Sequence, residues 1–269
     1  MENMIITILL ILTALLLWEL FFIFPTRWLK VERIYWDTKT RKKILQISDI
    51  HIRHLRVSHE KIQSILEEET PDYVFLTGDF IDKHEREFDS LKSLLQMIQK
   101  TGIEMYGVLG NHDRYIDEDK VEELEKLLHE CGVNLLKNDY VEKNDVFIVG
   151  IDDCCKGHCD INKSFDFHNP ENKEILVLTH DPDAVLEIDQ PFSFFVSGHL
   201  HGKQVNVPFF FKIKDMGKVA QQGMYQGKHQ HDRGPIYISK GISQTALNIR
   251  FWVRSEVTVH HLAPRAENK

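Results

Sequence analysis

Residues 105–113 read MYGVLGNHD, a short apolar run that ends in a cluster of polar side chains. Short apolar runs bounded by glycine and aspartate are typical of buried β-strands. The polar cluster therefore follows directly from the carboxyl end of a predicted strand. The same arrangement recurs along the chain, and this recurrence predicts the fold more firmly than the single motif does.

Four further apolar runs end in polar motifs in the same way. They are residues 43–51 (KILQISDIH), 72–79 (DYVFLTGD), 174–181 (EILVLTHD) and 192–203 (FSFFVSGHLHGK). Apolar side chains recur at helical spacing in residues 58–69, 85–100 and 117–131. Strands that alternate with helices predict an α/β fold with parallel strands in the first half of the chain. Further on, the sequence indicates a hairpin at residues 140–148 and strands at 235–239 and 252–259.

The five motifs bring together residues that are typical metal ligands. In open α/β sheets, ligands bind at the edge where the parallel strands end. The candidate ligands are Asp49, His51, Asp79, Asn111, His180, His199 and His201. Oxygen and imidazole ligands suit manganese, iron, cobalt, nickel or zinc, and seven of them suit two ions that share a bridging carboxylate. A lone buried histidine is more often a core residue, but the ordered series of five motifs favours a dinuclear metal site.

This series of motifs resembles the calcineurin-like metallophosphoesterases over residues 43–261. The apolar N-terminal segment and the stretch GHLHGKQ at residues 198–204 resemble a bacterial, membrane-anchored branch that includes phosphodiesterases and UDP-diacylglucosamine hydrolases. The resemblance implies a β-sandwich of two sheets flanked by helices, with two metals at one rim. It also implies hydrolysis of a phosphoester or pyrophosphate bond by a hydroxide that bridges the metals. The expected metal is manganese, with iron, zinc, cobalt or nickel as alternatives.

The resemblance also divides the ligands between the two ions. One ion would be held by Asp49, His51 and His201. The other would be held by Asn111, His180 and His199, and Asp79 would bridge both.

Four further residues are expected to bind the substrate, to act on it or to orient a residue that does, rather than to bind the metals. The resemblance implies that His112 stabilises the phosphoryl oxygens and protonates the leaving oxygen, and that Asp82 orients His112. Lys203 stands where the branch often has glycine, so it is expected either to meet a substrate phosphate or to be solvated. Arg114 is a second predicted substrate contact.

The N-terminal segment is apolar from residue 5 to residue 24, apart from Thr7, Thr13 and Glu19. About 20 such residues in a helix span the hydrocarbon core of a bilayer. A cleaved signal peptide is the alternative, but a basic first region and a cleavage site are both missing from the sequence. Basic residues are frequent at positions 27–43, and positive residues stay on the cytoplasmic side of a membrane. The sequence therefore predicts a single-pass protein of the cell membrane with a cytoplasmic catalytic domain.

Composition and cysteine usage agree with this interpretation. The chain has 269 residues and a net charge of −8, which argues against nucleic-acid binding because phosphate neutralisation needs excess lysine and arginine. The cysteines Cys154, Cys155 and Cys159 share one stretch, and we expect a reduced, structurally idle cluster, with a separate metal or redox role as the alternative. Residues 207–211 (VPFFF) are expected to be core, or else to meet acyl chains or the bilayer.

We divide the chain into an anchor (1–29), a basic juxtamembrane linker (30–42), a metallophosphoesterase domain (43–262) and a C-terminal tail (263–269). The predicted partners are a phosphorylated small molecule or a lipid-linked substrate such as UDP-diacylglucosamine, and the membrane. The alternative function is a non-catalytic scaffold with the same fold that binds a protein at the membrane. A scaffold predicts eroded ligands, whereas all seven ligand positions and His112 are filled here.

Overall fold

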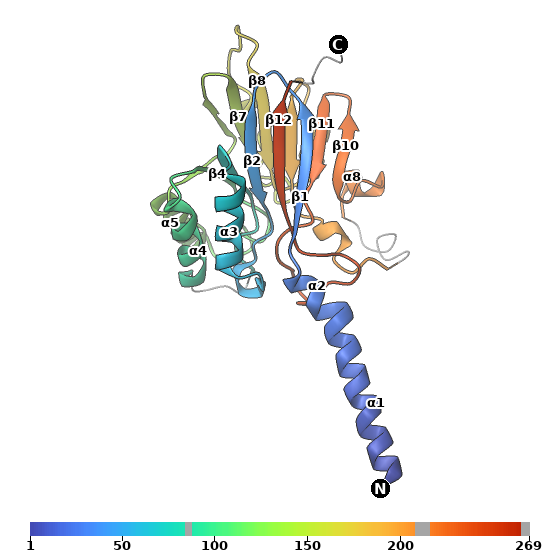
Figure 1. The fold of residues 1–269 in the computed structure, drawn as a ribbon. Helices are drawn as coiled ribbons and strands as arrows, with labels where there is room; N and C mark the ends of the chain where they lie inside the picture. The colour runs from blue at the N-terminus through green and yellow to red at the C-terminus, as the bar shows by residue number, and fades with distance from the viewer. Residues whose placement is uncertain (84–87, 208–215, 265–269) are drawn as a thin grey trace.

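The computed structural model of the chain describes residues 1–83, 88–207 and 216–264. Two sheets of six strands form a sandwich (Figure 1). The first sheet has the order β1 (Lys30–Asp37), β12 (Glu256–Ala263), β2 (Lys42–Ile47), β3 (Tyr73–Thr77), β4 (Glu104–Val108), β5 (Val133–Leu135). The second has the order β10 (Gly227–His231), β11 (Gly234–Ile238), β9 (Phe194–Ser197), β8 (Glu174–Thr179), β7 (Val146–Ile151), β6 (Asp139–Glu142). The predicted two-sheet sandwich flanked by helices is confirmed.

Strand direction places the ends of the motif-bearing strands together. Strands β2 to β5 are parallel to one another, and β7, β8, β9 and β11 are parallel in the second sheet. The hairpin of β6 and β7 is antiparallel, as predicted. The last predicted strand begins at Glu256 rather than at Trp252, because the preceding Phe251 bonds through its backbone to Gln204 and Asn206.

Helices cover the outer faces of the sandwich. Helices α3 (His59–Glu69), α4 (Asp89–Gln99) and α5 (Glu118–Glu130) pack on the first sheet, while the short α6 (Ile161–Ser164) and α8 (Lys218–Gln221) pack on the second. Ser58 caps α3 by accepting a hydrogen bond from the backbone of Lys61 at 3.3 Å. Between the sheets lies a third apolar layer, to which Phe75 and Tyr106 contribute from the first sheet and Phe194 from the second.

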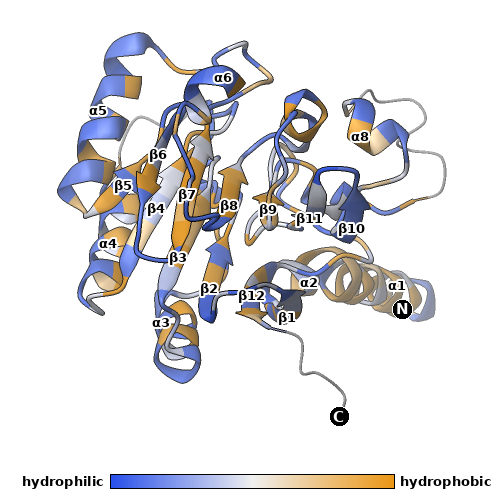
Figure 2. Cartoon of the chain, turned by 90° about the horizontal axis from the view of Figure 1, so that it is seen from above, coloured by the Kyte–Doolittle hydropathy of each residue, from blue (hydrophilic) through white to orange (hydrophobic). Residues whose placement is uncertain are grey.

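The N-terminal helix projects from the lower end of the sandwich (Figure 1). Helix α1 (Glu2–Trp18) continues through a π-helical turn (Glu19–Ile23) into α2 (Phe24–Arg27). Figure 2 colours most of α1 as hydrophobic, and its side chains are exposed. The helix is long and apolar enough to cross a membrane.

Residues 30–42 differ from the predicted linker. Eight of them form β1, which pairs in parallel with β12. Trp36 is buried between the sheets, and Val31 packs against the core beneath the helices. The basic residues beside Val31 and Trp36 obscured the strand pattern in the sequence. These basic residues also form ion pairs in the folded domain, for example Arg33 with Glu69.

Candidate metal centre

The structure brings all seven predicted ligands to one rim of the sandwich. The first sheet contributes Asp49 and His51 after β2, Asp79 after β3 and Asn111 after β4. The second sheet contributes His180 after β8, and His199 and His201 after β9. All seven follow strands that end at this rim, so both sheets build one site.

The backbone at these strand ends turns sharply. Asp49, Asp79 and His199 have φ angles of 53°, 54° and 72°, in the left-handed region that side chains rarely adopt. Such positions cost roughly 1–3 kcal/mol each and persist where the surrounding structure enforces them. The glycines of the motifs permit close approach, since a Cβ atom at Gly110 would lie 2.2 Å from Asp79 Oδ1. The motifs therefore fix a strained turn that aims each side chain at the rim.

Asp79 lies between two groups of histidines. Its Oδ2 atom is 3.4 Å from Nε2 of His51 and 3.2 Å from Nε2 of His180. On one side, His201 Nε2 lies 3.3 Å from Oδ1 of Asp49. Asp79 is thus the carboxylate that contacts both halves of the site.

The donors on the His51 side fit a divalent metal. Neither ring nitrogen of His51 has a hydrogen-bond partner among the residues that the structure describes, although the side chain is fully buried. Buried polar atoms without partners are rare and mark a site that something else satisfies. The donor atoms of Asp49, His51, Asp79 and His201 all lie within 4.8 Å of one another. This mixture of carboxylate oxygen and imidazole nitrogen suits borderline divalent ions.

The second group gathers around His180. Its Nε2 atom lies 3.2 Å from Oδ1 of Asn111 and 3.2 Å from Nδ1 of His199. Its Nδ1 atom lies 2.8 Å from the carbonyl oxygen of Thr77 and donates to it, which leaves Nε2 free to face the centre. Burial lowers the pKa of His180, but the charges of Asp79 and Asp49, together with the hydrogen bonds to Asp79 and Thr77, hold that pKa well above its ordinary value. The centre thus attracts positive charge.

His201 has the matching arrangement in the first group. Its Nδ1 atom lies 3.2 Å from the carbonyl oxygen of Ser243, so Nε2 points toward Asp49. Burial lowers the pKa of His201 to about 3, which favours the neutral imidazole that coordinates metals.

His112 lies beside the ligands and remains partly exposed. Its Nδ1 atom is 2.8 Å from Oδ1 of Asp82, and its Nε2 atom is 3.4 Å from Oγ1 of Thr245. Burial lowers the pKa of His112, but the hydrogen bond to Asp82 and the charge of Asp79 together raise it above its ordinary value. An imidazole with a raised pKa beside the proposed metal ligands is placed to donate a proton or to stabilise an anion.

Sequence reasoning missed three residues around this histidine. His54 Nε2 lies 3.2 Å from the second oxygen of Asp82, so Asp82 joins two imidazoles. Thr245 comes from a distant segment that carried no motif. The buried Asp113 accepts hydrogen bonds from the backbone of Gly110 and Ile81, and burial raises its pKa to about 7. Only Asp113 had a signal in the sequence, because it completes the GNHD motif.

The two predicted substrate contacts lie in different settings. Lys203 Nζ lies 4.1 Å from the centre of the Tyr225 ring, and it borders a cavity of about 180 Å³ together with Asn206 and Gln226. Arg114 is mostly buried and pairs with the carboxylates of Asp152 and Glu125.

The cysteine loop differs from expectation. Cys154 and Cys159 form a disulfide, so the prediction of a fully reduced cluster is wrong for this pair. Their sulfurs are brought together by the turn that begins at Asp153, which sequence spacing alone did not reveal. Cys155 is a free thiol whose Sγ atom lies 3.1 Å from Asp181 Oδ2 and 3.8 Å from His199 Nε2. The Val207–Phe211 stretch lies, from residue 208 onward, outside the described residues.

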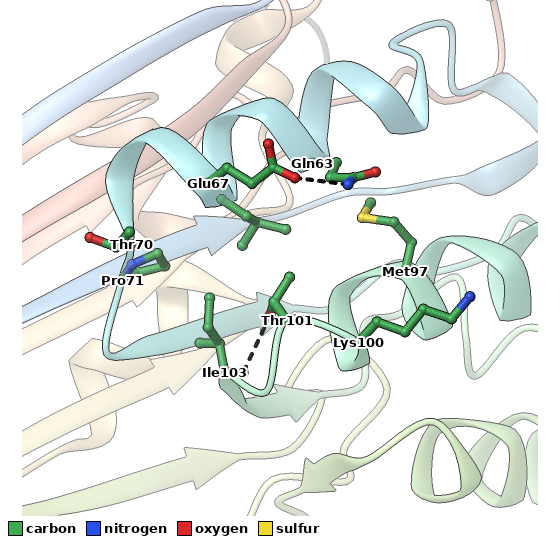
Figure 3. Close-up of a pocket in the computed structure, with 9 residues that line it drawn as sticks. Gln63, Glu67, Thr70, Pro71, Met97, Lys100, Thr101 and Ile103 are labelled. Atoms are coloured by element: carbon green, nitrogen blue, oxygen red, sulfur yellow. Dashed lines mark hydrogen bonds between the residues drawn. The ribbon is translucent and has the colours of Figure 1, made fainter.

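A larger cavity lies away from this rim. It measures about 690 Å³ and opens between the carboxyl ends of α3 and α4, where Gln63, Thr70, Met97 and Lys100 line it (Figure 3). Thr70 precedes β3 and Ile103 precedes β4, so the cavity borders the strand starts. The metal ligands follow the ends of the same strands, at the opposite rim.

Comparison with known proteins agrees with this geometry. Residues 42–203 match the family model described as calcineurin-like phosphoesterase. This match covers more than half of the chain, so the chain belongs to the calcineurin-like phosphoesterases. It is therefore a metal-dependent phosphoester hydrolase.

Three relatives show how similar the chain is to other members. YkoQ of Bacillus subtilis, an uncharacterized metallophosphoesterase, is 37% identical over 88% of this chain and 92% of its own length. The phosphodiesterase YaeI of Escherichia coli is 27% identical over 84% of each chain. The UDP-2,3-diacylglucosamine pyrophosphatase LpxG of Chlamydia muridarum is 26% identical over 67% of this chain and 71% of its own length.

Proposed function

We propose that this hydrolase uses two divalent ions, most simply manganese, held by the seven residues at the rim. The first ion is assigned to Asp49, His51 and His201. The second is assigned to Asn111, His180 and His199. Asp79 is assigned to both. The observation that carries this proposal is the position of Asp79 Oδ2 between His51 Nε2 and His180 Nε2, at 3.4 Å and 3.2 Å.

The chain's own residues complete the chemistry. Two bound ions would supply the positive charge that activates a water and neutralises the phosphoryl group. Asp82 accepts the Nδ1 hydrogen of His112, which leaves the Nε2 hydrogen of His112 to face the substrate. His112 then stabilises the phosphoryl oxygens and passes a proton to the leaving oxygen. Lys203 is proposed to contact a more distant phosphate of the substrate, and Arg114 stays a predicted substrate contact.

The proposed substrate is a phosphodiester or pyrophosphate, in particular one linked to a lipid, such as UDP-diacylglucosamine. Two observations support a lipid-linked substrate: the apolar helix beside the site, and the similarity to a phosphodiesterase and a diacylglucosamine pyrophosphatase. The net charge of −8 supports a partner other than nucleic acid.

We also propose that α1 spans the cell membrane once and that the catalytic domain lies in the cytoplasm. The exposed Arg27 at the end of the helix supports this orientation. Arg27 pairs with Glu19 and Arg33 pairs with Glu69, whereas a Cys154–Cys159 disulfide is typical of oxidising compartments. The proposed orientation therefore rests on the excess of basic residues at positions 27–43.

A hydrolysis screen of the full chain in detergent tests the proposed activity. The manganese-loaded protein would be compared on bis-p-nitrophenyl phosphate, p-nitrophenyl phosphate and UDP-diacylglucosamine, with Asp79→Asn as the matched control. We expect the diester and the pyrophosphate to be cleaved faster than the monoester, and the control to be inactive. A protein that cleaves none of them with manganese, iron, zinc, cobalt or nickel would instead be the scaffold of the alternative hypothesis.

A further inference from the structure

The N-terminal helix joins the sandwich at the same rim as the metal centre. Strand β1 starts at Lys30, which pairs with Glu256 at the start of β12. Strand β12 runs antiparallel to β2, so its start lies beside the end of β2, from which the chain enters the metal motif at Asp49. The helix therefore leaves the domain at the rim that holds the metal ligands (Figure 1).

The connection between helix and domain is short and bonded. Helix α2 ends at Arg27 and β1 begins at Lys30. The hydroxyl of Ser255 donates to the carbonyl oxygen of Thr26 at 2.9 Å, and Arg56 Nη1 donates to the Thr26 hydroxyl at 3.2 Å. A membrane that holds α1 is thus held at a fixed place relative to the rim.

One segment connects the helix to the catalytic residues. We call residues 244–254 the rim loop. On one side, Phe251 stacks on Phe22 of the N-terminal helix, with ring centres 5.0 Å apart. On the other side, Gln204 of the GHLHGKQ stretch donates to the carbonyl oxygens of Thr245 and Leu247, at 2.9 Å and 2.8 Å. Thr245 in turn lies 3.4 Å from His112.

The rim loop exposes large apolar side chains next to the helix. Trp252 is 71% exposed and Leu247 is 67% exposed, and Trp28 at the helix end is 50% exposed. Tryptophan is enriched where a membrane meets water, because its ring is apolar and its N–H is polar. The guanidinium of Arg254 lies 3.6 Å from the centre of the Trp28 ring, and the exposed Arg27 pairs with the equally exposed Glu19 at 3.2 Å.

We propose that the rim loop and Trp28 rest in the headgroup layer of the bilayer that holds α1, with Arg27 and Arg254 facing anionic phospholipids. This inference rests on the proposed membrane anchorage. Because this surface is continuous with α1, we expect it to contact the same bilayer. The chain has a net charge of −8, but the arginines of this surface complement anionic headgroups. The metal centre then faces the membrane surface, where a lipid-linked phosphate reaches it without leaving the bilayer.

Tryptophan quenching by brominated lipids tests this surface. The full chain would be placed, one copy per nanodisc, in bilayers of ordinary or brominated phosphatidylcholine and phosphatidylglycerol. The variant Trp18→Phe/Trp28→Phe keeps Trp252 and the buried Trp36, which lies between the sheets. We expect brominated lipid to quench the fluorescence of Trp252 strongly in this variant. The fluorescence of Trp18→Phe/Trp28→Phe/Trp252→Phe should be the same in both lipids. Equal fluorescence in both lipids for the variant that keeps Trp252 would overturn the proposal.

A second variant distinguishes the absence of contact between the rim loop and the bilayer from the absence of membrane insertion by α1. Trp28→Phe/Trp252→Phe keeps Trp18, which lies in α1 and reports insertion of the helix. Quenching of Trp18 without quenching of Trp252 would mean that the helix is anchored but that the rim loop contacts water or protein instead. Absence of quenching at both would overturn the anchorage as well.

A charge substitution provides the functional control. In the Trp18→Phe background, Trp252→Glu should weaken quenching at Trp28 and leave hydrolysis of soluble bis-p-nitrophenyl phosphate unchanged. Leu186→Glu is the matched control, since Leu186 is an exposed leucine in the turn that follows β8, outside the rim loop. If Leu186→Glu weakened the quenching to the same extent, the effect would be general and the surface assignment would be overturned.

Discussion

The backbone N–H of Arg250 donates to the carbonyl oxygen of Phe22 at 2.9 Å, which bonds the end of the apolar helix to the loop beside the metal centre. The guanidinium of Arg250 is buried and donates through Nη2 to three carbonyl oxygens, those of Lys240, Gly241 and Ser243. The Ser243 oxygen also faces Nδ1 of His201. One arginine therefore supports both the helix attachment and a predicted metal ligand.

Replacing Arg250 by methionine should destabilise the domain and weaken metal binding. Hydrogen bonds from a charged donor contribute about 1.5–3 kcal/mol each. Methionine cannot donate, so the three carbonyl oxygens would lose the guanidinium as their donor. We expect the free energy of unfolding to fall by about 3 kcal/mol or more. Urea unfolding of the full chain in detergent, with and without manganese, measures both effects. Arg41→Met, at an exposed arginine, is the control, and equal stability of the two variants would contradict the prediction.

Replacing Asp79 by alanine should remove both metals. Each group of ligands loses the carboxylate that it shares, and each ion loses the charge compensation of that oxygen. Elemental analysis of the purified variant would detect the loss. Asp82→Asn, which changes a nearby carboxylate outside the proposed ligand set, should keep both ions. Two ions retained by Asp79→Ala would refute the bridging assignment.

Much of the fold and the site was predictable because the signals are local. Each ligand follows an apolar run that predicts a strand. Because parallel strands end at a common edge of the sheet, the motifs at Asp49, Asp79 and Asn111 were predicted to lie close together. The helix after Ser58 was likewise predictable, because the cap and the apolar spacing lie within one short segment.

The features that escaped prediction depend on distant parts of the chain. Strand β1 pairs with β12 across more than two hundred positions, and charged residues disguise its burial pattern. The Cys154–Cys159 disulfide depends on a turn rather than on spacing. Thr245 and Arg250 belong to no sequence motif. They contact imidazole and carbonyl groups that come close to them only in the folded chain.

The stability of the domain should depend on pH through His260. Trp36 Nε1 donates to His260 Nδ1 at 3.1 Å, and His260 Nε2 lies 3.0 Å from Gln46 Oε1, so the buried ring is neutral. Burial lowers the pKa of His260 well below its ordinary value. Below about pH 6.5 the unfolded chain therefore binds a proton that the native state does not, and this histidine alone removes up to about 1.4 kcal/mol of stability per pH unit.

Urea unfolding of the metal-free chain from pH 7.5 to pH 5 would measure this dependence. His260→Gln should lower stability at pH 7.5 and should flatten the loss of stability as the pH falls. His129→Asn, at an exposed histidine, controls for the removal of one histidine. An unchanged slope in His260→Gln would contradict the assignment.

The orientation of the domain can be determined by thiol labelling. In a Cys155→Ser background, Glu123→Cys places a thiol on the exposed face of α5, where the native glutamate side chain is 53% exposed. Because positive residues such as Arg27 stay on the cytoplasmic side, an impermeant maleimide should label intact protoplasts only after lysis. Labelling before lysis would place the domain outside, where a Cys154–Cys159 disulfide persists.

The final prediction separates metal binding from proton transfer at His112. Asn111 and His112 are neighbours, yet Asn111 Oδ1 faces His180 while the His112 ring faces Asp82 and Thr245. His112→Asn should therefore keep both metals and the fold. It should lower turnover by roughly 100- to 10,000-fold, the range for general acid–base groups. The measurement is turnover on esters whose leaving groups differ in pKa, with metal content determined in parallel.

The loss in His112→Asn should be largest for leaving groups of high pKa, because these need a proton as the bond breaks, and smaller for nitrophenolate. Asp82→Asn should produce a milder form of the same pattern, since it leaves the imidazole in place but removes the carboxylate that orients it at 2.8 Å. Loss of metal in His112→Asn would make this histidine a ligand. An equal loss of rate for good and poor leaving groups would leave His112 an electrostatic role and exclude its role as the acid.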